Sequence, residues 1–153
     1  AFFSIMLLFN SIIDNAQEKA LPEKDFQETY KKALNAMTTL LDTRGAPEFW
    51  KPENAVIIGI ADTSRVLSQQ KLSRLMNASS NSSINIEEKL ALNGYKLSFS
   101  LEYQNGTTVS VNTSYYFGNV SFGSFSSNES IASIEEKAVY NKQVVIAKLR
   151  VGK

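Results

Sequence analysis

Ala1-Phe2-Phe3-Ser4-Ile5-Met6-Leu7-Leu8-Phe9-Asn10-Ser11-Ile12-Ile13 opens the chain, and this stretch decides how the protein is organised. Nine of its thirteen residues are large and apolar, and none is charged. A helix of this composition is apolar on every side, whereas a surface helix has one apolar stripe. Its whole circumference must be buried in lipid, in its own domain or among copies of itself. We therefore expect a hydrophobic N-terminal assembly helix over residues 1–21 and a globular head domain over residues 22–153.

The apolar stretch is too short to span a bilayer alone. A helix rises about 1.5 Å per residue, so this stretch covers ~20 Å of a hydrocarbon core that is ~30 Å thick. It also lacks the basic n-region and the small-residue cleavage site of a secretory signal peptide. Two alternatives stay open: residues upstream of Ala1 have been removed, or the segment packs against protein.

The composition of the chain argues against catalysis and against nucleic acid. The 153 residues suit one domain, and the net charge of +1 comes without any basic run. The chain has no cysteine, which excludes disulfides and thiolate chemistry. It also has no histidine, the commonest metal ligand and general base. We expect no enzymatic activity, no cofactor, no metal site and no nucleic-acid partner.

A second helical pattern follows Pro22. Proline kinks a helix interior, so we expect a kink near Pro22. Beyond it, large apolar residues recur at helical spacing and predict an amphipathic helix that ends near Asp42, before Gly45 and Pro47. The residues of this stripe are Phe26, Tyr30, Ala33, Leu34, Met37, Leu40 and Leu41.

The second half of the chain has the alternation of β-strands. Apolar residues alternate with polar ones over 96–103 and again over 109–117, and Asn105-Gly106 between them predicts a hairpin turn. Two more strands are expected over 134–140 and 144–151. Earlier in the chain, the apolar run 55–61 predicts a buried strand, and Ser68 is placed to cap a short helix over 69–76. Helices followed by antiparallel strands predict an α+β fold, with the long N-terminal helix packed on one face of an antiparallel sheet.

Two kinds of residue that attract a functional interpretation are expected to be structural. Trp50, the only tryptophan, follows a Gly-x-Pro loop and is expected in the core rather than in a ligand site. The neighbouring acids Glu87-Glu88 and Glu135-Glu136 do not converge if they lie on strands, because adjacent strand residues point to opposite faces. We expect both acidic pairs on the solvated surface.

Six Asn-x-Ser/Thr sequons lie within one stretch, between residues 77 and 128. The asparagine and hydroxyl content of the chain gives about two or three by chance. The excess indicates an exported, glycosylated surface, with coincidence in Ser-rich loops as the alternative. The candidate N-glycosylation residues are Asn77, Asn81, Asn105, Asn112, Asn119 and Asn128.

The segment 40–50, Leu-Leu-Asp-Thr-Arg-Gly-Ala-Pro-Glu-Phe-Trp, carries a resemblance to a known family. Together with Ile58-Gly59-Ile60-Ala61, Leu67-Ser68-Gln69-Gln70-Lys71-Leu72 and the C-terminal hairpin pattern, it resembles archaeal type IV pilin-like proteins, which are made with a class III signal peptide. The matching positions cover roughly residues 33–76 and 134–151. A pilin-like fold is what the resemblance implies.

The resemblance also implies a function, which is that of a pilin. Such a subunit waits in the membrane, is processed by prepilin peptidase and then polymerises with copies of itself into an extracellular filament, here expected to serve surface adhesion. The residues that would pack in the filament core are Phe2, Phe3, Ile5, Met6, Leu8, Phe9, Ile12 and Ile13. The alternative is a membrane-tethered, glycosylated surface adhesin or binding module that does not polymerise.

Overall fold

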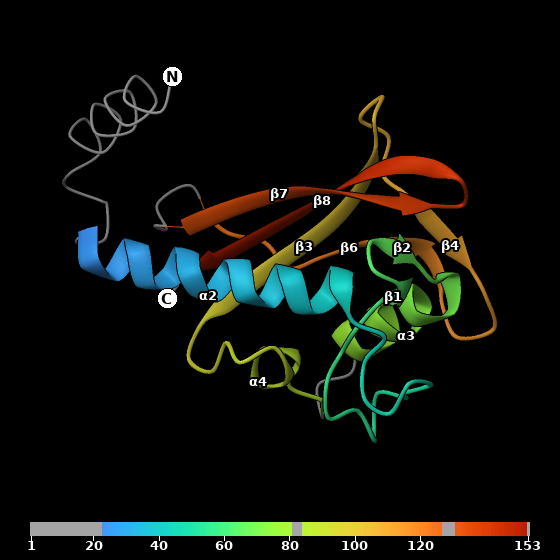
Figure 1. The fold of residues 1–153 in the computed structure, drawn as a ribbon, viewed down its shortest axis with the longest axis horizontal. Coiled ribbons are helices and arrows are strands. Elements are labelled where there is room, and N and C mark those ends of the chain that lie inside the picture. Colours follow the sequence, from blue (N-terminus) through green and yellow to red (C-terminus); the bar gives the residue numbers. More distant parts are fainter. Residues whose placement is uncertain (1–22, 81–83, 127–130, 153) are drawn as a thin grey trace.

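The computed structural model describes residues 23–80, 84–126 and 131–152. This part of the chain is mostly β, and its helices all precede the long strands in the sequence (Figure 1). In chain order the elements are α2 (Glu23–Asp42), β1 (Ala61–Thr63), β2 (Val66–Leu67), α3 (Gln69–Ser79), α4 (Ile86–Lys89), β3 (Lys96–Tyr103), β4 (Ser110–Asn112), β5 (Phe117–Asn119), β6 (Ser121–Phe122), β7 (Ile131–Tyr140) and β8 (Gln143–Gly152).

Six strands form one curled sheet in the order β1-β2-β7-β8-β3-β6, and β4 and β5 form a separate pair. The sheet is built around β8, which pairs antiparallel with β7 on one side and with β3 on the other. The pairing of β2 with β7 is parallel, and the remaining pairings are antiparallel. The sheet curls into a half-barrel, which suits strands as long and twisted as β7 and β8.

Strict alternation explains why the central strands form where they do. Along β3, Leu97, Phe99 and Leu101 are buried while the intervening side chains are polar. Along β8, Val145, Ala147, Leu149 and Val151 are buried in the same way. Because successive strand residues point to opposite faces, both strands present one apolar face to the core. The other face is polar along β3, and along β8 it carries Lys148 and Arg150 after Val144 and Ile146.

Helix α2 lies along the apolar face of the sheet and contacts β7 and β8 (Figure 1). Its fully buried apolar residues are Ala33, Ala36, Met37, Leu40 and Leu41, which recur at the spacing of one helix face. The carbonyls in its last turn, which have no partner within the helix, accept hydrogen bonds from the following segment. The N–H of Ile60 donates to the carbonyl of Leu40 at 2.9 Å, and that of Arg65 donates to Leu41 at 2.8 Å.

Trp50 and three neighbours form a tightly packed cluster beside the end of α2, which we call the Trp50 clasp (Thr43, Gly45, Trp50 and Gly59). The indole is fully buried, and its Nε1 donates to the Gly59 carbonyl at 2.8 Å. A Cβ on Gly45 would overlap Trp50 Cδ1, and one on Gly59 would overlap the Thr43 carbonyl. The expectation that Trp50 is a core residue is confirmed. The run 55–61 is not the strand we expected, because its backbone docks on α2 and on Ala46, and only Ala61 belongs to a strand.

The chain that returns from β3 does not form the long second strand that the alternation over 109–117 predicts. Val109 donates to the Leu101 carbonyl at 2.8 Å, and Leu101 donates to the Val120 carbonyl at 3.0 Å. Val120 also donates to Val109 at 2.7 Å, so the chain leaves and rejoins the edge of β3 at one point. Residues 110–119 therefore form an excursion, the β4–β5 hairpin, and β6 takes the next place beside β3.

The predicted fold class is wrong. The structure is mostly β, a curled half-barrel of six strands with a parallel pairing, and within the described residues the helix that packs along it is α2, in place of the long N-terminal helix that we predicted. The first described helix begins only at Glu23, next to a proline, which favours the first turn of a helix. The prediction also lacks the β1–β2 hairpin. The kink near Pro22 and residues 1–21 lie outside the described residues.

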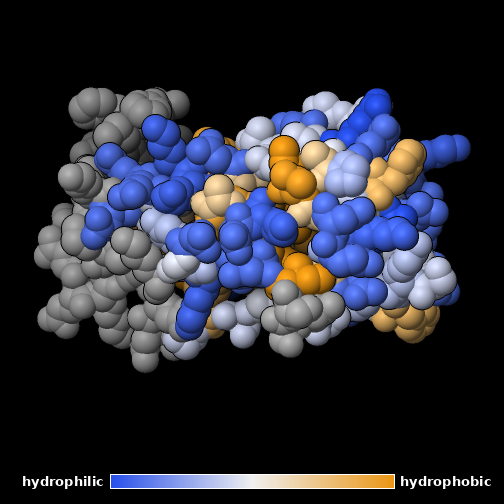
Figure 2. Space-filling view, turned by 90° about the horizontal axis from the view of Figure 1, so that it is seen from below, coloured by the Kyte–Doolittle hydropathy of each residue, from blue (hydrophilic) through white to orange (hydrophobic). Residues whose placement is uncertain are grey.

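The side of the molecule seen in Figure 2 is mostly hydrophilic where residues are described, and the strongest apolar colour gathers near the centre of the view. Among the described residues, no helix combines the length and the apolar composition that crossing a bilayer requires.

Candidate functional site

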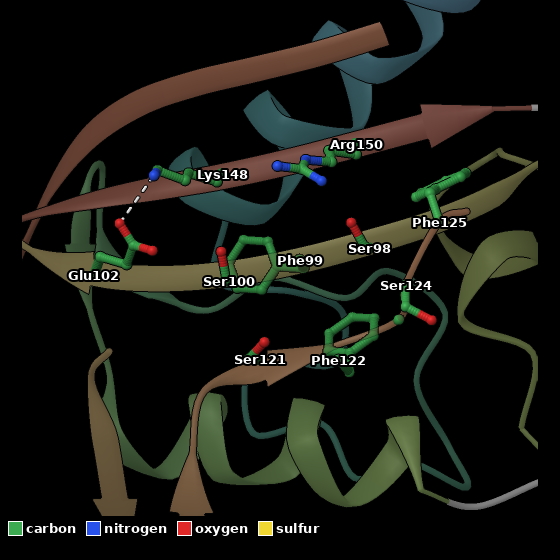
Figure 3. Close-up of a pocket in the computed structure, with 11 residues that line it drawn as sticks. Ser98, Phe99, Ser100, Glu102, Ser121, Phe122, Ser124, Phe125, Lys148 and Arg150 are labelled. Atoms are coloured by element: carbon green, nitrogen blue, oxygen red, sulfur yellow. Dashed lines mark ion pairs between the residues drawn. The ribbon is translucent and has the colours of Figure 1, made fainter. Parts of the chain in front are cut away.

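A shallow polar groove lies on the outer face of the sheet, over β3, β6 and β8 (Figure 3). Its volume is about 300 Å³. The groove follows from the alternation described above, since the strand residues that do not face the core collect on this side. Side chains that line it from the strands are Ser98, Ser100, Glu102, Ser121, Lys148 and Arg150, with Ser124 and Phe125 following β6.

Strand register sets the groove's polar groups in rows. Ser100 is the cross-strand partner of both Ser121 and Lys148, and Lys148 is in turn the partner of Glu135. The Lys148 ammonium lies 2.9 Å from a carboxylate oxygen of Glu102 and 3.9 Å from one of Glu135. The hydrogen bond to Glu102 raises the pKa of Lys148 above its ordinary value. Lys148 is thus neutralised by two carboxylates.

Arg150 is the cation of the groove that stays available. It is exposed and makes no ion pair with any residue that the structure describes, and its cross-strand partners are Ser98 and Ser133. Figure 3 shows Arg150 and Phe125 toward the same end of the groove. A guanidinium beside serine hydroxyls and an aromatic ring can donate hydrogen bonds to a carboxylate or to sugar hydroxyls. The sequence did not reveal this site, because it depends on which strands are neighbours.

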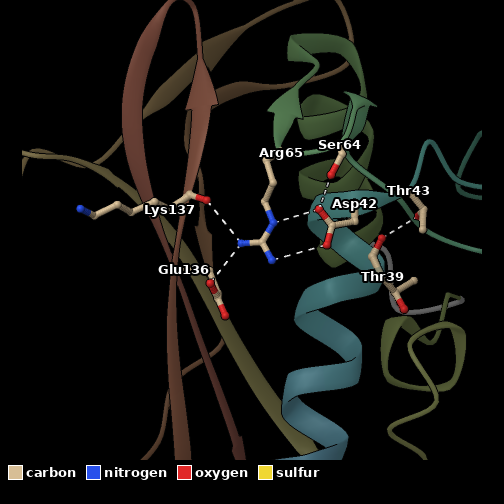
Figure 4. A network of polar contacts seen from close by, with 7 residues as sticks. All are labelled: Thr39, Asp42, Thr43, Ser64, Arg65, Glu136 and Lys137. Carbon is tan, nitrogen blue, oxygen red and sulfur yellow. Dashed lines mark hydrogen bonds and ion pairs between the residues drawn. The ribbon is translucent and has the colours of Figure 1, made fainter. Parts of the chain in front are cut away.

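A second polar cluster centres on Arg65 and connects three elements (Figure 4). The Arg65 guanidinium donates to Asp42 at 2.9 Å and to Glu136 at 3.1 Å, and the Ser64 hydroxyl donates to Asp42 at 2.7 Å. Hydrogen bonds from Arg65 and then from Ser64 lower the pKa of Asp42, and the bond to Asp42 raises that of Arg65. The cluster joins the end of α2 to the β1–β2 turn and to β7. Both of its carboxylates, those of Asp42 and Glu136, form an ion pair with Arg65, so we interpret the cluster as a structural joint.

The acidic pairs singled out in the sequence do not form a site. Glu135 and Glu136 point to opposite faces, toward Lys148 and Arg65 respectively. Glu87 and Glu88 lie in the short helix α4, not on a strand. No group of three acidic side chains within residues 23–80, 84–126 and 131–152 is arranged to hold a metal ion.

Helix α3 carries a buried cation that sequence reasoning missed. Arg74 is largely buried, and its Nη1 donates to the Trp50 carbonyl at 2.9 Å. Its guanidinium lies 5.2 Å from the centroid of the Tyr115 ring, a cation–π contact, while its Nε is buried without a hydrogen-bond partner. Arg74 therefore links the Trp50 clasp to the β4–β5 hairpin.

The structure describes four of the six candidate glycosylation residues. Asn105, Asn112 and Asn119 are exposed, whereas Asn77 is half-buried and its amide nitrogen donates to the Tyr115 carbonyl at 3.3 Å. Asn112 and Asn119 lie on the paired strands β4 and β5. Asn81 and Asn128 lie outside the described residues, as do all the residues expected to pack in a filament core.

No family model, curated protein or solved structure matches this chain.

Proposed function

We propose that this protein is a structural subunit of an archaeal type IV-like extracellular filament, polymerising through its N-terminal apolar segment. The observation that carries the proposal is the uninterrupted apolar stretch of residues 1–13, with nine large apolar residues and no charge. Burying about 100 Å² of each of those side chains contributes on the order of 20 kcal/mol before the costs of association. A segment of this kind does not stay exposed to water.

The surface of α2 supports the proposal. Beside the stripe that faces the sheet, Phe26, Tyr30 and Leu34 follow one another at i, i+4 and i+8. The Phe26 and Tyr30 rings stack with centroids 6.4 Å apart, and Tyr30 and Leu34 are 43% and 38% exposed. The exposed side chains of Tyr30 and Leu34 on α2 provide further apolar area for contact with a neighbouring subunit.

The chemistry of the head fits a structural role. The clusters around Arg65 and Lys148 consist of neutralised ion pairs, and the residues of the family-like segment 40–50 serve in the Trp50 clasp and at the end of α2. The polar groove on the sheet favours a second candidate function. A membrane-tethered surface module would use Arg150 and the serines to bind an acidic or polyhydroxylated ligand.

Electron microscopy of the full chain tests the proposal. We expect negatively stained samples to show long fibres of uniform width that sediment at high speed. Phe9→Asp places a charge in the packing segment. A loss of about 1.4 kcal/mol in association free energy lowers the equilibrium constant tenfold, so we expect the fibre yield to fall about tenfold or more. Phe49→Asp is the matched control, since Phe49 is 70% exposed on the head, and fibres are expected to persist.

Two outcomes would contradict the filament proposal. Isolated heads or micelle-like rosettes of the unaltered chain support the tethered binding module instead. Fibres that form equally well with Phe9→Asp remove the role assigned to the apolar segment.

A further inference from the structure

Phe117 on β5 is the most exposed of the large apolar side chains that the structure describes, at 78%. Single exposed apolar residues are common and carry little meaning alone. The surroundings of Phe117 are unusual, however, because its neighbours on the same face of the hairpin are acceptor asparagines.

Register places two sequons around the Phe117 ring. Asn112 on β4 is the direct cross-strand partner of Phe117, which puts their Cβ atoms about 5 Å apart. Asn119 follows two residues later on β5, on the same face and about 6.6 Å along the strand. Both asparagines are exposed, and each begins an Asn-x-Ser/Thr sequence.

The other face of β5 is anchored, so this orientation is fixed. Tyr116 packs against the hydrophobic core, its ring lies over Gly118, and its hydroxyl donates to the Asn119 carbonyl at 3.0 Å. Tyr115 is held by the ring contact with Arg74 and by the hydrogen bond from Asn77. These contacts occupy both tyrosines and leave Phe117 and Asn119 facing outward.

The other described sequons lack this arrangement. Asn77 uses its amide nitrogen in a hydrogen bond, and the Ser79 hydroxyl of the same sequon donates to the Met76 carbonyl at 2.7 Å. Asn105 lies in the turn after β3, and the aromatic residue that precedes it by two positions, Tyr103, packs against the core. Of these four sequons, the two on the β4–β5 hairpin have an exposed aromatic ring next to an exposed acceptor asparagine.

We propose that the outer face of the β4–β5 hairpin is a glycan-attachment surface, on which Asn119 carries an N-linked glycan whose first sugar covers the Phe117 ring. The proposal rests on the extracellular location of the proposed filament. Attachment joins C1 of a sugar, donated from a lipid-linked phosphate, to Nδ2 of Asn119. The lipid phosphate leaves with the electron pair of the broken C1–O bond, and the proton lost by the amide nitrogen passes to water.

Packing explains why the ring and the acceptor belong together. One face of a pyranose ring is lined by C–H groups and can lie flat on a phenyl ring, which removes both surfaces from water. A two-stranded sheet is marginally stable by itself. The sugar therefore stabilises the hairpin, and Phe117 is its platform.

Glycopeptide mass spectrometry of the full-length protein, isolated from the cells that produce it, tests the attachment. We expect a glycan on the peptide that contains Asn119 and none on the peptide that contains Asn77. A bare Asn119 overturns the proposal.

A thermal double-mutant cycle on the same glycoprotein tests the packing. We expect Asn119→Gln and Phe117→Ala each to lower the unfolding temperature by about 2–4 °C. The unfolding temperature of the double variant should be no lower than that of the less stable single variant, because both changes remove the same contact between sugar and ring. Phe49→Ala is the matched control, an exposed phenylalanine away from any sequon, and its effect should add to that of Asn119→Gln. Additive effects of Phe117→Ala and Asn119→Gln overturn the proposal.

Failure of this inference can be told apart from failure of the filament. If Asn119 is bare and Phe117→Asp abolishes the fibres, Phe117 is a contact between subunits, which overturns the glycan surface and leaves the filament standing. If Asn119 is glycosylated and coupled to Phe117 but microscopy shows isolated heads, the glycan surface stands and the filament fails.

Discussion

Two glycines lie beneath aromatic rings in this protein, one in the Trp50 clasp and one in the β4–β5 hairpin. A Cβ on Gly45 would overlap Cδ1 of the fully buried Trp50 and lie 2.8 Å from the indole nitrogen. A Cβ on Gly118 would lie 3.1 Å from the Tyr116 hydroxyl, at the tip of a side chain near the surface. The same local motif is therefore rigid in the clasp and adjustable in the hairpin, because only the clasp is enclosed by other elements.

The enclosure of the clasp comes from the chain segments around it. Thr43 donates its hydroxyl to the Thr39 carbonyl, and the backbone of 60–65 caps the end of α2. The hairpin is attached to the rest of the molecule chiefly through Val109, Val120 and contacts from α3. A change in the clasp should thus destabilise the whole fold, and a change in the hairpin should act locally.

Gly45→Ala is expected to have the largest effect, because it changes the rigid clasp. We expect the free energy of unfolding to fall by about 3 kcal/mol, because overpacking a rigid site adds to the strain of a side chain at φ +86°. Urea denaturation measures the effect. A loss below about 0.5 kcal/mol, the usual range for surface changes, would mean that the clasp is not rigid.

Gly118→Ala makes the same change in the hairpin. At φ +146° some strain remains, but the Tyr116 hydroxyl can move by a few tenths of an ångström, so we expect a loss of about 1 kcal/mol. Amide hydrogen exchange should accelerate in residues 110–119 and stay unchanged in α2. Faster exchange throughout the sheet would show that the hairpin is coupled to the core more tightly than we infer.

Asp42→Asn changes the polar joint at the same end of α2 as the clasp. The carboxylate accepts from Arg65 and Ser64 but is partly exposed, so we expect a loss of about 1 kcal/mol at neutral pH. Equilibrium denaturation of both proteins at several pH values provides the measurement.

The pH dependence of this difference has a definite sign. Because the pKa of Asp42 is lowered in the folded state, its stabilising contribution is complete above the unfolded pKa of about 4. Below that value the unfolded chain binds the proton first, so the advantage over Asp42→Asn should shrink as pH falls through the folded pKa. An advantage that grows with acidification would contradict the assignment of Arg65 as partner.

The sequence predicted the parts of the fold that depend on local periodicity. The expected strands over 96–103, 134–140 and 144–151 correspond to β3, β7 and β8, and Ser68 caps α3 as expected. Alternation over 109–117 failed as a guide because Val109 and Val120 close onto Leu101 and exclude the residues between them from the sheet. The fold class failed for a related reason, since the β1–β2 hairpin and its parallel pairing with β7 have no signature in short-range spacing.

The candidate sites likewise fall into those that local sequence reveals and those that depend on strand pairing. A sequon or an apolar run is visible in the sequence, but whether Asn112 and Asn119 share a face with Phe117 depends on strand register. The polar groove and the burial of Arg74 likewise arise from elements distant in sequence. Such sites could not be found without the pairing of the strands.

The single tryptophan of the chain lies buried in the clasp with its ring nitrogen hydrogen-bonded to Gly59. Its fluorescence therefore reports on one defined place, beside the end of α2, where Arg74 donates a hydrogen bond to the Trp50 carbonyl. The folded protein should emit at short wavelength and resist quenching by iodide, and both properties should be lost together when the clasp opens. The molecule thus carries its own optical probe of the junction between helix and sheet.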